Sequence, residues 1–310
     1  KSLKLLGLGA EALGGHPVTE LRLFAGNAFA RAPLPGAAIG LSRRRMDGLL
    51  IDQAQAEGAA LERGVTVREI GEDRTVRLGD GAALSPDSLF LATGKHDLRG
   101  VKRDRSDADI ALGLRLRLPP HPALTALAGG AIELQLFDRG YCGLVLQEDG
   151  SGNLCMAVRK SRLAEADGDP LTLFQQIASE NPAFADRMAF AARAPMIDAI
   201  SAVPYGWVAR DTVSGLFKLG DQAAVIPSLA GEGNGIALAS GIIAAKVWGQ
   251  GGSATDFQSQ FTVQAVRPIR IASLLWHLGE RPTLGWIGTR LAALVPRLAG
   301  HFAGQTRIRY

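Results

Sequence analysis

The chain has 310 residues, 47% of them hydrophobic, so it can bury a large core, and its length favours two interleaved domains. Glycine, proline or a charge interrupts the longest apolar stretches before the roughly 18 residues that a membrane span needs, and no charged-then-apolar signal segment opens the sequence. Composition therefore excludes a membrane-spanning class and predicts a soluble, cytoplasmic protein.

The net charge of +4 is unevenly distributed along the chain. Residues 257–310 hold seven arginines and one acid, so the basic surplus lies at the C-terminal end. The two cysteines, Cys142 and Cys155, are too few for a disulfide framework or a metal site, so we expect reduced, structural thiols and no metal. No Ser/His/Asp set and no pair of acids stands out.

The first residues offer a motif that its surroundings contradict. Gly7, Gly9 and Ala12 have the spacing of a dinucleotide-binding turn, which must open a helix of several turns. Because Gly14 and Gly15 follow at once, we expect a short helix that ends at these glycines.

The next segments predict α/β organisation. Residues 18–36 alternate apolar and polar side chains around Gly26 and Asn27, which is typical of a hairpin. Residues 41–61 have apolar side chains at helical spacing, and residues 88–94 form a short buried strand. Helix and strand signals thus follow one another along this part of the chain.

The pattern changes to period two between about residues 110 and 160, which predicts an antiparallel sheet with one covered face. Residues 171–192 return to helical spacing, and Asn181-Pro182 divides them into two helices.

The sequence KLGDQAAVIPSLAGEGNG, residues 218–235, follows a short apolar strand and precedes an apolar helix. Strand, acid, glycine-rich loop and helix follow one another in this order at cofactor-binding sites. Asp221 can accept hydrogen bonds from sugar hydroxyls, glycines let the backbone approach a ligand, and the N-terminus of the helix stabilises an anion. From these residues alone, an ordinary loop before a tightly packed helix is the alternative.

Two later helices carry further signals. The first has a small residue at every fourth position, so we expect a close packing partner on that face: Gly233, Ala237, Gly241 and Ala245. Residues 284–302 predict an amphipathic helix with Arg290 and Arg297 on its basic side, either as a peripheral membrane contact or pocket cap, or as an ordinary terminal helix. Nucleic-acid binding is not expected, because the arginines are not interleaved with exposed aromatic residues.

The glycine-rich loop (residues 218–235) resembles the second FAD-binding motif of the p-hydroxybenzoate hydroxylase-like flavoprotein superfamily, through Gly220-Asp221, then Pro227, then Gly231-x-Gly233 before an alanine-rich helix. This superfamily includes aromatic-ring monooxygenases, geranylgeranyl reductases and flavin-dependent halogenases. SRRRMDGLL resembles the family's Arg-x-x-apolar-Asp helix start, and LFLATGKHDLRG resembles the strand that closes its first flavin segment. The similarity covers most of the chain.

The resemblance implies an FAD site. Asp221 would hold the ribityl hydroxyls, with Gly220 and Pro227 shaping the loop. Gly231, Gly233 and Asn234 would present backbone near the pyrimidine end of the flavin, where the helix dipole favours the anionic reduced form. Arg43 would lie near the FAD phosphates, or else is an exposed arginine. Tyr141 would line the substrate cavity, or else packs half-buried at a strand edge.

The sequence departs from the family in two places. The printed residues contain no strand, G-x-G-x-x-G turn and helix for the ADP phosphates. We expect that segment to be missing or disordered; a true loss would severely weaken FAD binding. Residues 139–147, RGYCGLVLQ, lack the Trp and Pro that reductases and halogenases carry there, which disfavours a halogenase and weakens the case for an isoprenoid reductase.

The resemblance thus implies a mixed α/β flavoprotein, with an FAD-binding Rossmann-like domain interleaved with an antiparallel-sheet substrate domain and a helical C-terminus. The expected parts are residues 37–100 and 201–250 for the FAD domain, residues 101–200 with 18–36 for the sheet domain, and residues 251–310 for the helices.

The implied activity is that of an NAD(P)H-dependent monooxygenase acting on an apolar aromatic or polyketide-like small molecule. The alternatives are a geranylgeranyl reductase-like flavoprotein that reduces isoprenoid double bonds and a non-catalytic apolar-ligand binder on a degenerate flavin scaffold. The sequence indicates neither the catalytic residues nor the oligomeric state.

Overall fold

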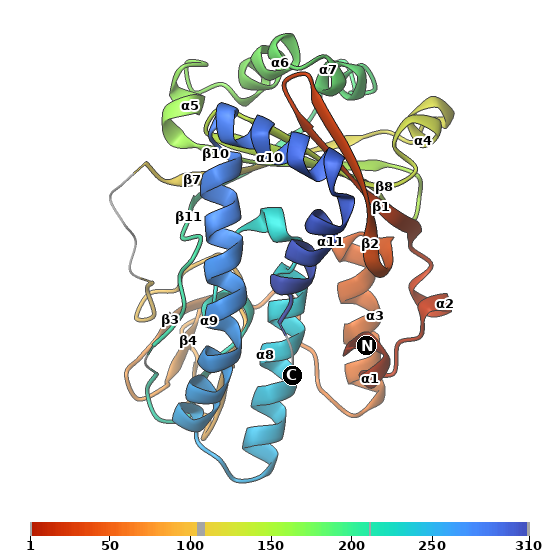
Figure 1. Ribbon diagram of the computed structural model, residues 1–310. Coiled ribbons are helices and arrows are strands. Elements are labelled where there is room, and N and C mark those ends of the chain that lie inside the picture. The colour runs from red at the N-terminus through yellow and green to blue at the C-terminus, as the bar shows by residue number, and fades with distance from the viewer. Residues whose placement is uncertain (1, 104–108, 211, 309–310) are drawn as a thin grey trace.

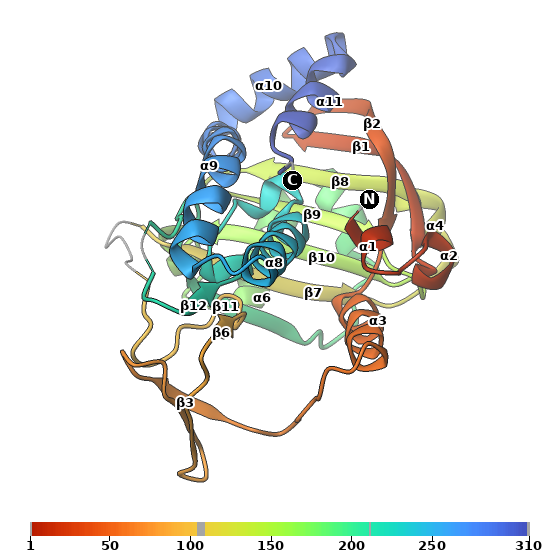
Figure 2. The same ribbon diagram turned by 90° about the horizontal axis from the view of Figure 1, so that it is seen from below.

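A seven-stranded sheet forms the centre of the protein. The structure is a computed structural model that describes residues 2–103, 109–210 and 212–308 (Figure 1). Neighbouring strands are antiparallel, except that β1 and β8 run parallel. In the order in which they cross the sheet (Figure 2), the strands are β11 (Ile197–Val203), β7 (Ala111–Leu118), β10 (Gly152–Arg159), β9 (Gly140–Leu146), β8 (Gly130–Phe137), β1 (His16–Ala25) and β2 (Ala28–Gly40).

The first face of the sheet is closely packed. Leucines of β7, β9 and β10 pack there against Phe174, Ile177 and Phe184, which are fully buried. The Asp169 carboxylate caps the third helix on this face and the Asn181 side-chain oxygen caps the fourth, so Asn181-Pro182 divides them as predicted. The helices are α4 (Pro122–Ala128), α5 (Lys160–Ala164), α6 (Pro170–Glu180) and α7 (Pro182–Met188).

Buried charges also lie on this first face. Glu133 of β8 is fully buried and accepts hydrogen bonds of 2.8 and 2.7 Å from the Arg187 guanidinium of α7. Arg22 of β1 donates a third, longer hydrogen bond of 3.3 Å to the same carboxylate. A buried carboxylate requires such partners, so this group joins α7, β1 and β8.

On the second face, α10 (Pro282–Leu294) packs over β8, β1 and β2, α11 (Pro296–Gln305) packs over β2, and the end of α9 (Ala254–Gly279) reaches Leu136 of β8. Arg115 and Arg117 of β7 are exposed on that face, so the predicted single covered face holds for this part of the sheet and not for β8. The predicted single helix over 284–302 is wrong, since it is interrupted at Val295 and Pro296. Proline has no N–H to continue the helix and is tolerated in the first turn of the next one.

Below the sheet in Figure 1 lies a smaller unit built around two parallel strands, β6 (Leu89–Leu91) and β12 (Leu216–Lys218). Its apolar core joins β12 to α8 (Gly233–Gly249) and α9 through Phe217, Ile236, Phe257 and Phe261. The remaining elements are α1 (Ser2–Leu5), α2 (Ala10–Leu13), α3 (Arg43–Ala56), β3 (Val67–Ile70), β4 (Val76–Leu78), β5 (Ala83–Leu84), and the 3₁₀ turns η1 (Gly220–Gln222) and η2 (Ser228–Ala230).

The mixed α/β class with an extended antiparallel sheet and a helical C-terminus is confirmed. The turn at Gly7, Gly9 and Ala12 leads into the four-residue helix α2, which ends before Gly14, as expected. The domain boundaries remain a prediction. Within the described residues, no helix combines the length and the apolar character that crossing a bilayer requires.

Candidate functional site

The glycine-rich loop leaves the carboxyl end of β12 beside the loop that leaves β6. The backbone N–H of Leu219 donates to the carbonyl of Leu91 over 2.8 Å, which holds the two loops together. Gly220 turns in the left-handed region with φ of 56°, and its N–H donates to Ser240 Oγ of α8 over 2.8 Å. These bonds fix the backbone of Asp221 beside α8.

Asp221 is the charged centre of this loop. Its side chain is half-buried, and burial raises the pKa of its carboxyl above the usual value, while the positive charges of Lys95, Arg103 and Arg43 oppose that rise. A partly desolvated carboxylate is a strong acceptor for hydroxyl donors that replace its water. The structure thus brings together Asp221 and Arg43, which the sequence assigned to the site, and adds two further cations.

Arg103 holds the two loops in place. Its side chain is almost fully buried, and it pairs with Asp97 over 2.7 Å. It also donates to the backbone carbonyls of Lys95, in the loop after β6, and of Asp221, the latter over 2.9 Å. These bonds use most of the guanidinium donors. Arg103 therefore holds the backbone of Asp221 and Lys95 in place.

The N-terminus of α8 has no side-chain cap, but the buried carboxyl of Glu232 lies against its first turn, and burial raises the pKa of that carboxyl. The N-cap residue Glu232 makes no side-chain capping bond, and Gly231 before it has φ of 64°, so the chain turns into the helix in a conformation that favours glycine. Arg43, at the start of α3, donates to Asn234 Oδ1 over 3.1 Å and pairs with Asp47. Arg43 is therefore an exposed side chain that joins the first turns of α3 and α8.

A cluster of hydroxyls lies behind Pro227, which is itself buried. Tyr141 donates to Ser228 Oγ over 2.6 Å, and the Tyr205 hydroxyl lies 2.7 Å from the same atom. The Trp276 ring packs against both tyrosine rings. Burial raises the pKa of Tyr205 to about 12 and raises that of Tyr141 well above its usual value, so both phenols stay neutral and hold η2 by hydrogen bonds.

The small-residue face of α8 is only partly covered. Gly220 approaches it at Ala237, where a methyl group on Gly220 would lie 3.5 Å from the Ala237 Cβ. Among the described residues, methyl groups at Gly233 and Gly241 would meet no atom within 4 Å, and Ala245 is exposed. The predicted close partner is thus present at one position of the stripe, and the described chain leaves the others open.

An apolar cavity of about 510 Å³ lies between the second face of the sheet and the C-terminal helices. Ile132, Leu134 and Leu136 of β8 form part of one wall, and leucines of α9, α10 and α11 form the opposite wall. The cavity reaches the glycine-rich loop at Leu229, Ala230 and Gly231. Arg307 is the one charged residue among the described residues that line it, so the cavity suits an uncharged, apolar molecule.

Tyr141, predicted to line the substrate cavity, does not belong to the described lining of this apolar space. It is buried beside Trp276, and its direct contact with a substrate remains a prediction. Sequence reasoning also missed Lys95, Arg103 and Ser228. Lys95 directly follows the predicted strand 88–94, and Ser228 follows Pro227. Their positions next to predicted motifs were the one sequence signal that could have identified them as site residues.

The described residues contain no group of three or more His, Cys, Asp and Glu side chains placed to hold a metal ion. Cys142 is buried in the sheet, where burial raises the pKa of its thiol, and Cys155 is exposed. Both thiols are free of disulfide bonds.

No protein-family model matches the sequence, and no curated protein matches it. Solved structures do match over almost the whole chain. The flavin-dependent brominase Bmp2 is 14% identical, with a TM-score of 0.76 over 99% of this chain and 82% of its own. This is the fold of flavin-dependent halogenases and monooxygenases. The superfamily resemblance inferred from the loop is thereby confirmed at the level of the fold.

Two oxygenases have the same fold. PqsL, a probable FAD-dependent monooxygenase from Pseudomonas aeruginosa, is 14% identical, with a TM-score of 0.65 over 93% of this chain and 87% of its own. A tetrameric form of 2-methyl-3-hydroxypyridine-5-carboxylic acid oxygenase is 16% identical, with a TM-score of 0.62 over 94% of this chain and 80% of its own.

The residues present fit the flavin end of FAD. The Asp221 carboxylate is partly desolvated, the N-terminus of α8 has no side-chain cap, and a methyl group at Gly231 or Gly233 would meet no described atom within 4 Å. A ligand backbone can approach there, and because burial favours the neutral form of Glu232 beside the first turn, an anionic ring edge is compatible with it. Arg43, which the resemblance assigns to the FAD phosphates, lies between the first turns of α3 and α8, and its role there remains a prediction.

Proposed function

We propose that the protein is an FAD-dependent monooxygenase that takes electrons from NAD(P)H and hydroxylates an uncharged, apolar small molecule of aromatic or polyketide-like character. The observation that carries this proposal is the junction of two features at one loop. The glycine-rich loop presents Asp221 and the uncapped N-terminus of α8, and its η2 turn forms part of the wall of the apolar cavity. A cofactor on the loop would therefore face a substrate in the cavity.

Each part of the chain has a defined task in this proposal. Asp221 accepts hydrogen bonds from the sugar-alcohol hydroxyls, and the N–H groups at the start of α8 stabilise negative charge on the ring. Tyr141 and Tyr205 hold Ser228, and with it the η2 turn between the two sites. The leucines of the cavity exclude water from the reacting atoms. Bound FAD would supply the electron transfer and the activation of oxygen.

The first test measures FAD binding to the full-length protein. We expect a yellow protein, and Asp221→Ala should lower FAD affinity about 10- to 100-fold, because it removes hydrogen bonds to a charged acceptor. Asp186→Ala is the matched control: Asp186 is exposed on α7, which covers the other face of the sheet (Figure 1), and its loss should leave the affinity unchanged. A colourless protein that takes up no added FAD contradicts the proposal.

The second test measures binding of a ligand in the cavity. The probe is N-phenyl-1-naphthylamine, an uncharged molecule that fluoresces in apolar surroundings. Leu291 lines the cavity, so Leu291→Trp should lower probe affinity about tenfold or more by filling its volume. Leu294, three residues away, is 78% exposed and lies outside the lining, so Leu294→Trp should bind the probe as the unmodified protein does. Equal binding by both variants would place the probe elsewhere.

Oxygen dependence separates the candidate reactions. With NADPH and a panel of uncharged aromatic compounds such as 1-naphthol, a monooxygenase forms hydroxylated product in air and none without oxygen. Product that forms without oxygen identifies a reductase, and brominated product in added bromide identifies a halogenase. Probe binding with no FAD uptake identifies the non-catalytic binder.

A further inference from the structure

The outer surface where α10 ends and α11 begins is apolar. Leu294 is 78% exposed and Val295 is 46% exposed, and around them Leu291, Leu298 and Phe302 are each between 40% and 51% exposed. We call these five residues the α10–α11 corner. Large apolar side chains gathered on one exposed surface are typical of a contact with a protein or a membrane.

The α10–α11 corner is continuous with the apolar cavity. Leu291, Leu298 and Phe302 belong to the corner and also line the cavity, whereas Leu294 and Val295 project beyond it. The corner is therefore the rim of the cavity. An apolar molecule that enters across this rim remains in contact with apolar side chains until it reaches η2, so its path avoids the cost of exposing it to water.

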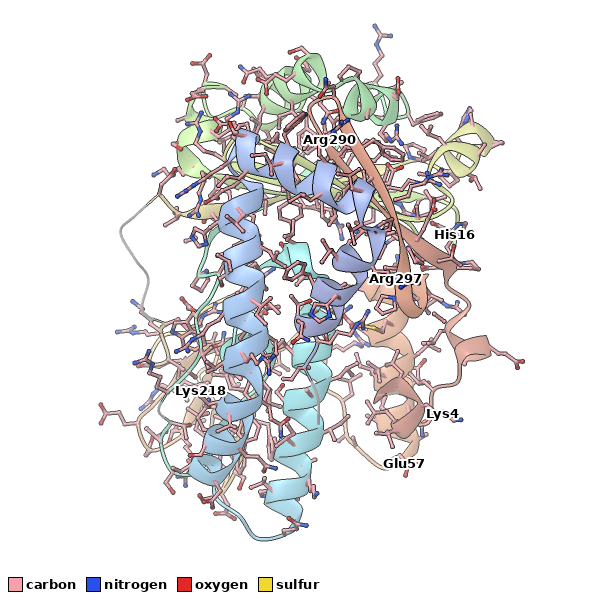
Figure 3. The ribbon with its side chains drawn as sticks, viewed as in Figure 1. Lys4, His16, Glu57, Lys218, Arg290 and Arg297 are labelled. Carbon is pink, nitrogen blue, oxygen red and sulfur yellow. The ribbon has the colours of Figure 1, made fainter. Side chains whose placement is uncertain are left out.

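The segment that contains the corner is basic. Residues 281–308 hold four arginines and no acidic residue, and one of the four, Arg307, pairs with Glu232 of the glycine-rich loop over 3.8 Å. Figure 3 shows Arg290 on α10 and Arg297 on α11, on either side of the corner. Both are exposed, and the Arg290 guanidinium lies 5.7 Å from the centre of the Trp286 ring. Exposed apolar side chains flanked by arginines match an anionic lipid surface, where the arginines meet headgroups and the leucines enter the acyl boundary.

The same charge pattern disfavours a second copy of the chain as the occupant. A twofold interface centred on the corner would bring the same surface of both subunits together, and with it Arg290 and Arg297 of each subunit. No acidic residue within residues 281–308 would offset that repulsion.

We propose that the α10–α11 corner docks on an anionic lipid bilayer, and that the cavity takes its apolar substrate directly from the membrane. The docking is inferred from the exposed apolar side chains of the corner and the arginines beside them. Only the route of the substrate rests on the proposed function. Docking is superficial in this proposal, with Leu294 and Val295 as the residues that enter the bilayer.

Flotation of the full-length protein with lipid vesicles tests the docking without any need for FAD. Vesicles of phosphatidylcholine with about 30% phosphatidylserine should bind at least about fivefold more protein than phosphatidylcholine alone, and about 0.5 M salt should remove the difference. Leu294→Glu should abolish the binding. Met196→Glu is its control, because Met196 is 86% exposed and lies in another part of the chain.

A charge-reversal pair separates the role of the arginines from net charge. Arg290→Glu with Arg297→Glu should lower binding to the level of phosphatidylcholine alone. Arg63→Glu with Arg193→Glu makes the same change in net charge at two exposed residues outside the C-terminal helices and should retain most of the binding. Equal loss in both double variants, or equal binding of the unmodified protein to both kinds of vesicle, overturns the proposal.

The substrate route is tested by transfer of N-phenyl-1-naphthylamine from loaded vesicles. Leu291→Trp should still float with anionic vesicles and yet take up no probe, whereas Leu294→Glu should take up probe from solution and not from vesicles. Vesicle binding by a protein that takes up no FAD would leave the docking standing and contradict the proposed function alone. A dimer that Leu294→Glu dissociates, with no vesicle binding, identifies a second copy as the occupant and overturns the membrane proposal.

Discussion

The seven-stranded sheet carries helices on both faces. On one face the side chains are closely packed, and on the other the helices and the sheet enclose a cavity. On the first face, leucines interdigitate with Phe174, Ile177 and Phe184, and a buried carboxylate is fully paired. On the second face, Ile132, Leu134 and Leu136 point into about 510 Å³ of apolar space. Close packing on the first face stabilises the fold. The second face lacks some of these packing contacts, and the space that they would fill can hold a small molecule.

Strand β8 shows this difference within eight residues. Its polar residues Glu133 and Gln135 are buried, Glu133 against Arg187 of α7 and Gln135 with its side-chain oxygen unpaired among the described residues, while Ile132, Leu134 and Leu136 line the cavity. Apolar side chains that face a cavity form a binding wall, and polar side chains that are buried require specific partners. A strand therefore serves stability on one side and recognition on the other.

The largest expected effect comes from breaking the buried ion group on the solid face. Glu133→Ala leaves the Arg187 guanidinium buried without its main partner, so it should lower the free energy of unfolding by about 3–5 kcal/mol. Leu134→Ala, on the neighbouring residue but facing the cavity, should cost about 1 kcal/mol, because it adds to a space that already exists. Urea denaturation measures both, and equal costs would contradict the contrast between the faces.

A smaller effect, of opposite sign, is expected on the cavity side. The Thr289 hydroxyl of α10 is buried and has no hydrogen-bond partner among the described residues, so Thr289→Val should raise the free energy of unfolding by about 1 kcal/mol. Thr306 is equally buried, but its hydroxyl donates to the Ala303 carbonyl over 3.1 Å. Thr306→Val should therefore lower stability, also by about 1 kcal/mol. Two changes of the same sign would contradict this account.

The smallest expected effect concerns Asp221 and depends on pH. Because burial raises the pKa of Asp221 in the folded protein, folding disfavours its charged form, and stability from this group falls as pH rises through the folded pKa. Asp221→Asn cannot ionise, so it should melt roughly 2 °C higher than the unmodified protein at about pH 8, with the difference shrinking towards about pH 4. Thermal melts at several pH values test this.

Asp198→Asn is the control for that series. Asp198 is exposed and pairs with Arg115, so its replacement should bring no gain in melting temperature at any pH. A gain of equal size in both variants would show that the effect comes from net charge, and that the desolvation of Asp221 is not its cause.

Local sequence patterns predicted the helices and strands better than they predicted what packs against them. The hairpin at Gly26 and Asn27, the strands of the sheet and the division at Asn181-Pro182 all follow from period and turn chemistry. The helices that pack over β8, β1 and β2 on the second face could not be predicted, because alternation shows that one side of a strand is apolar and does not show what lies against either side. Glu133 illustrates this, since its partners come from β1 and α7.

The candidate site was predicted in part. Gly220, Asp221, Pro227, Gly231, Gly233 and Asn234 are contiguous in sequence, so their grouping required only the loop, while Arg43 was placed by the family resemblance. Lys95 and Arg103 were not predicted as site residues, because their proximity to Asp221 results from the pairing of β6 with β12. That pairing joins segments that are distant in sequence. The roles of these residues toward FAD remain predictions.

The parallel pairing of β1 with β8 has a consequence for how the molecule assembles. It joins residues 111 positions apart, as in the hydrogen bond from Thr19 to the Gly130 carbonyl. Closing so long a loop costs chain entropy, and such contacts form late in folding. Since these two strands supply much of one cavity wall, we expect that wall to form after β7, β9 and β10 have packed, because their pairings join segments closer in sequence. Until β8 pairs with it, the inner edge of the β1–β2 hairpin would present unpaired backbone groups, which is the kind of edge at which chains associate wrongly.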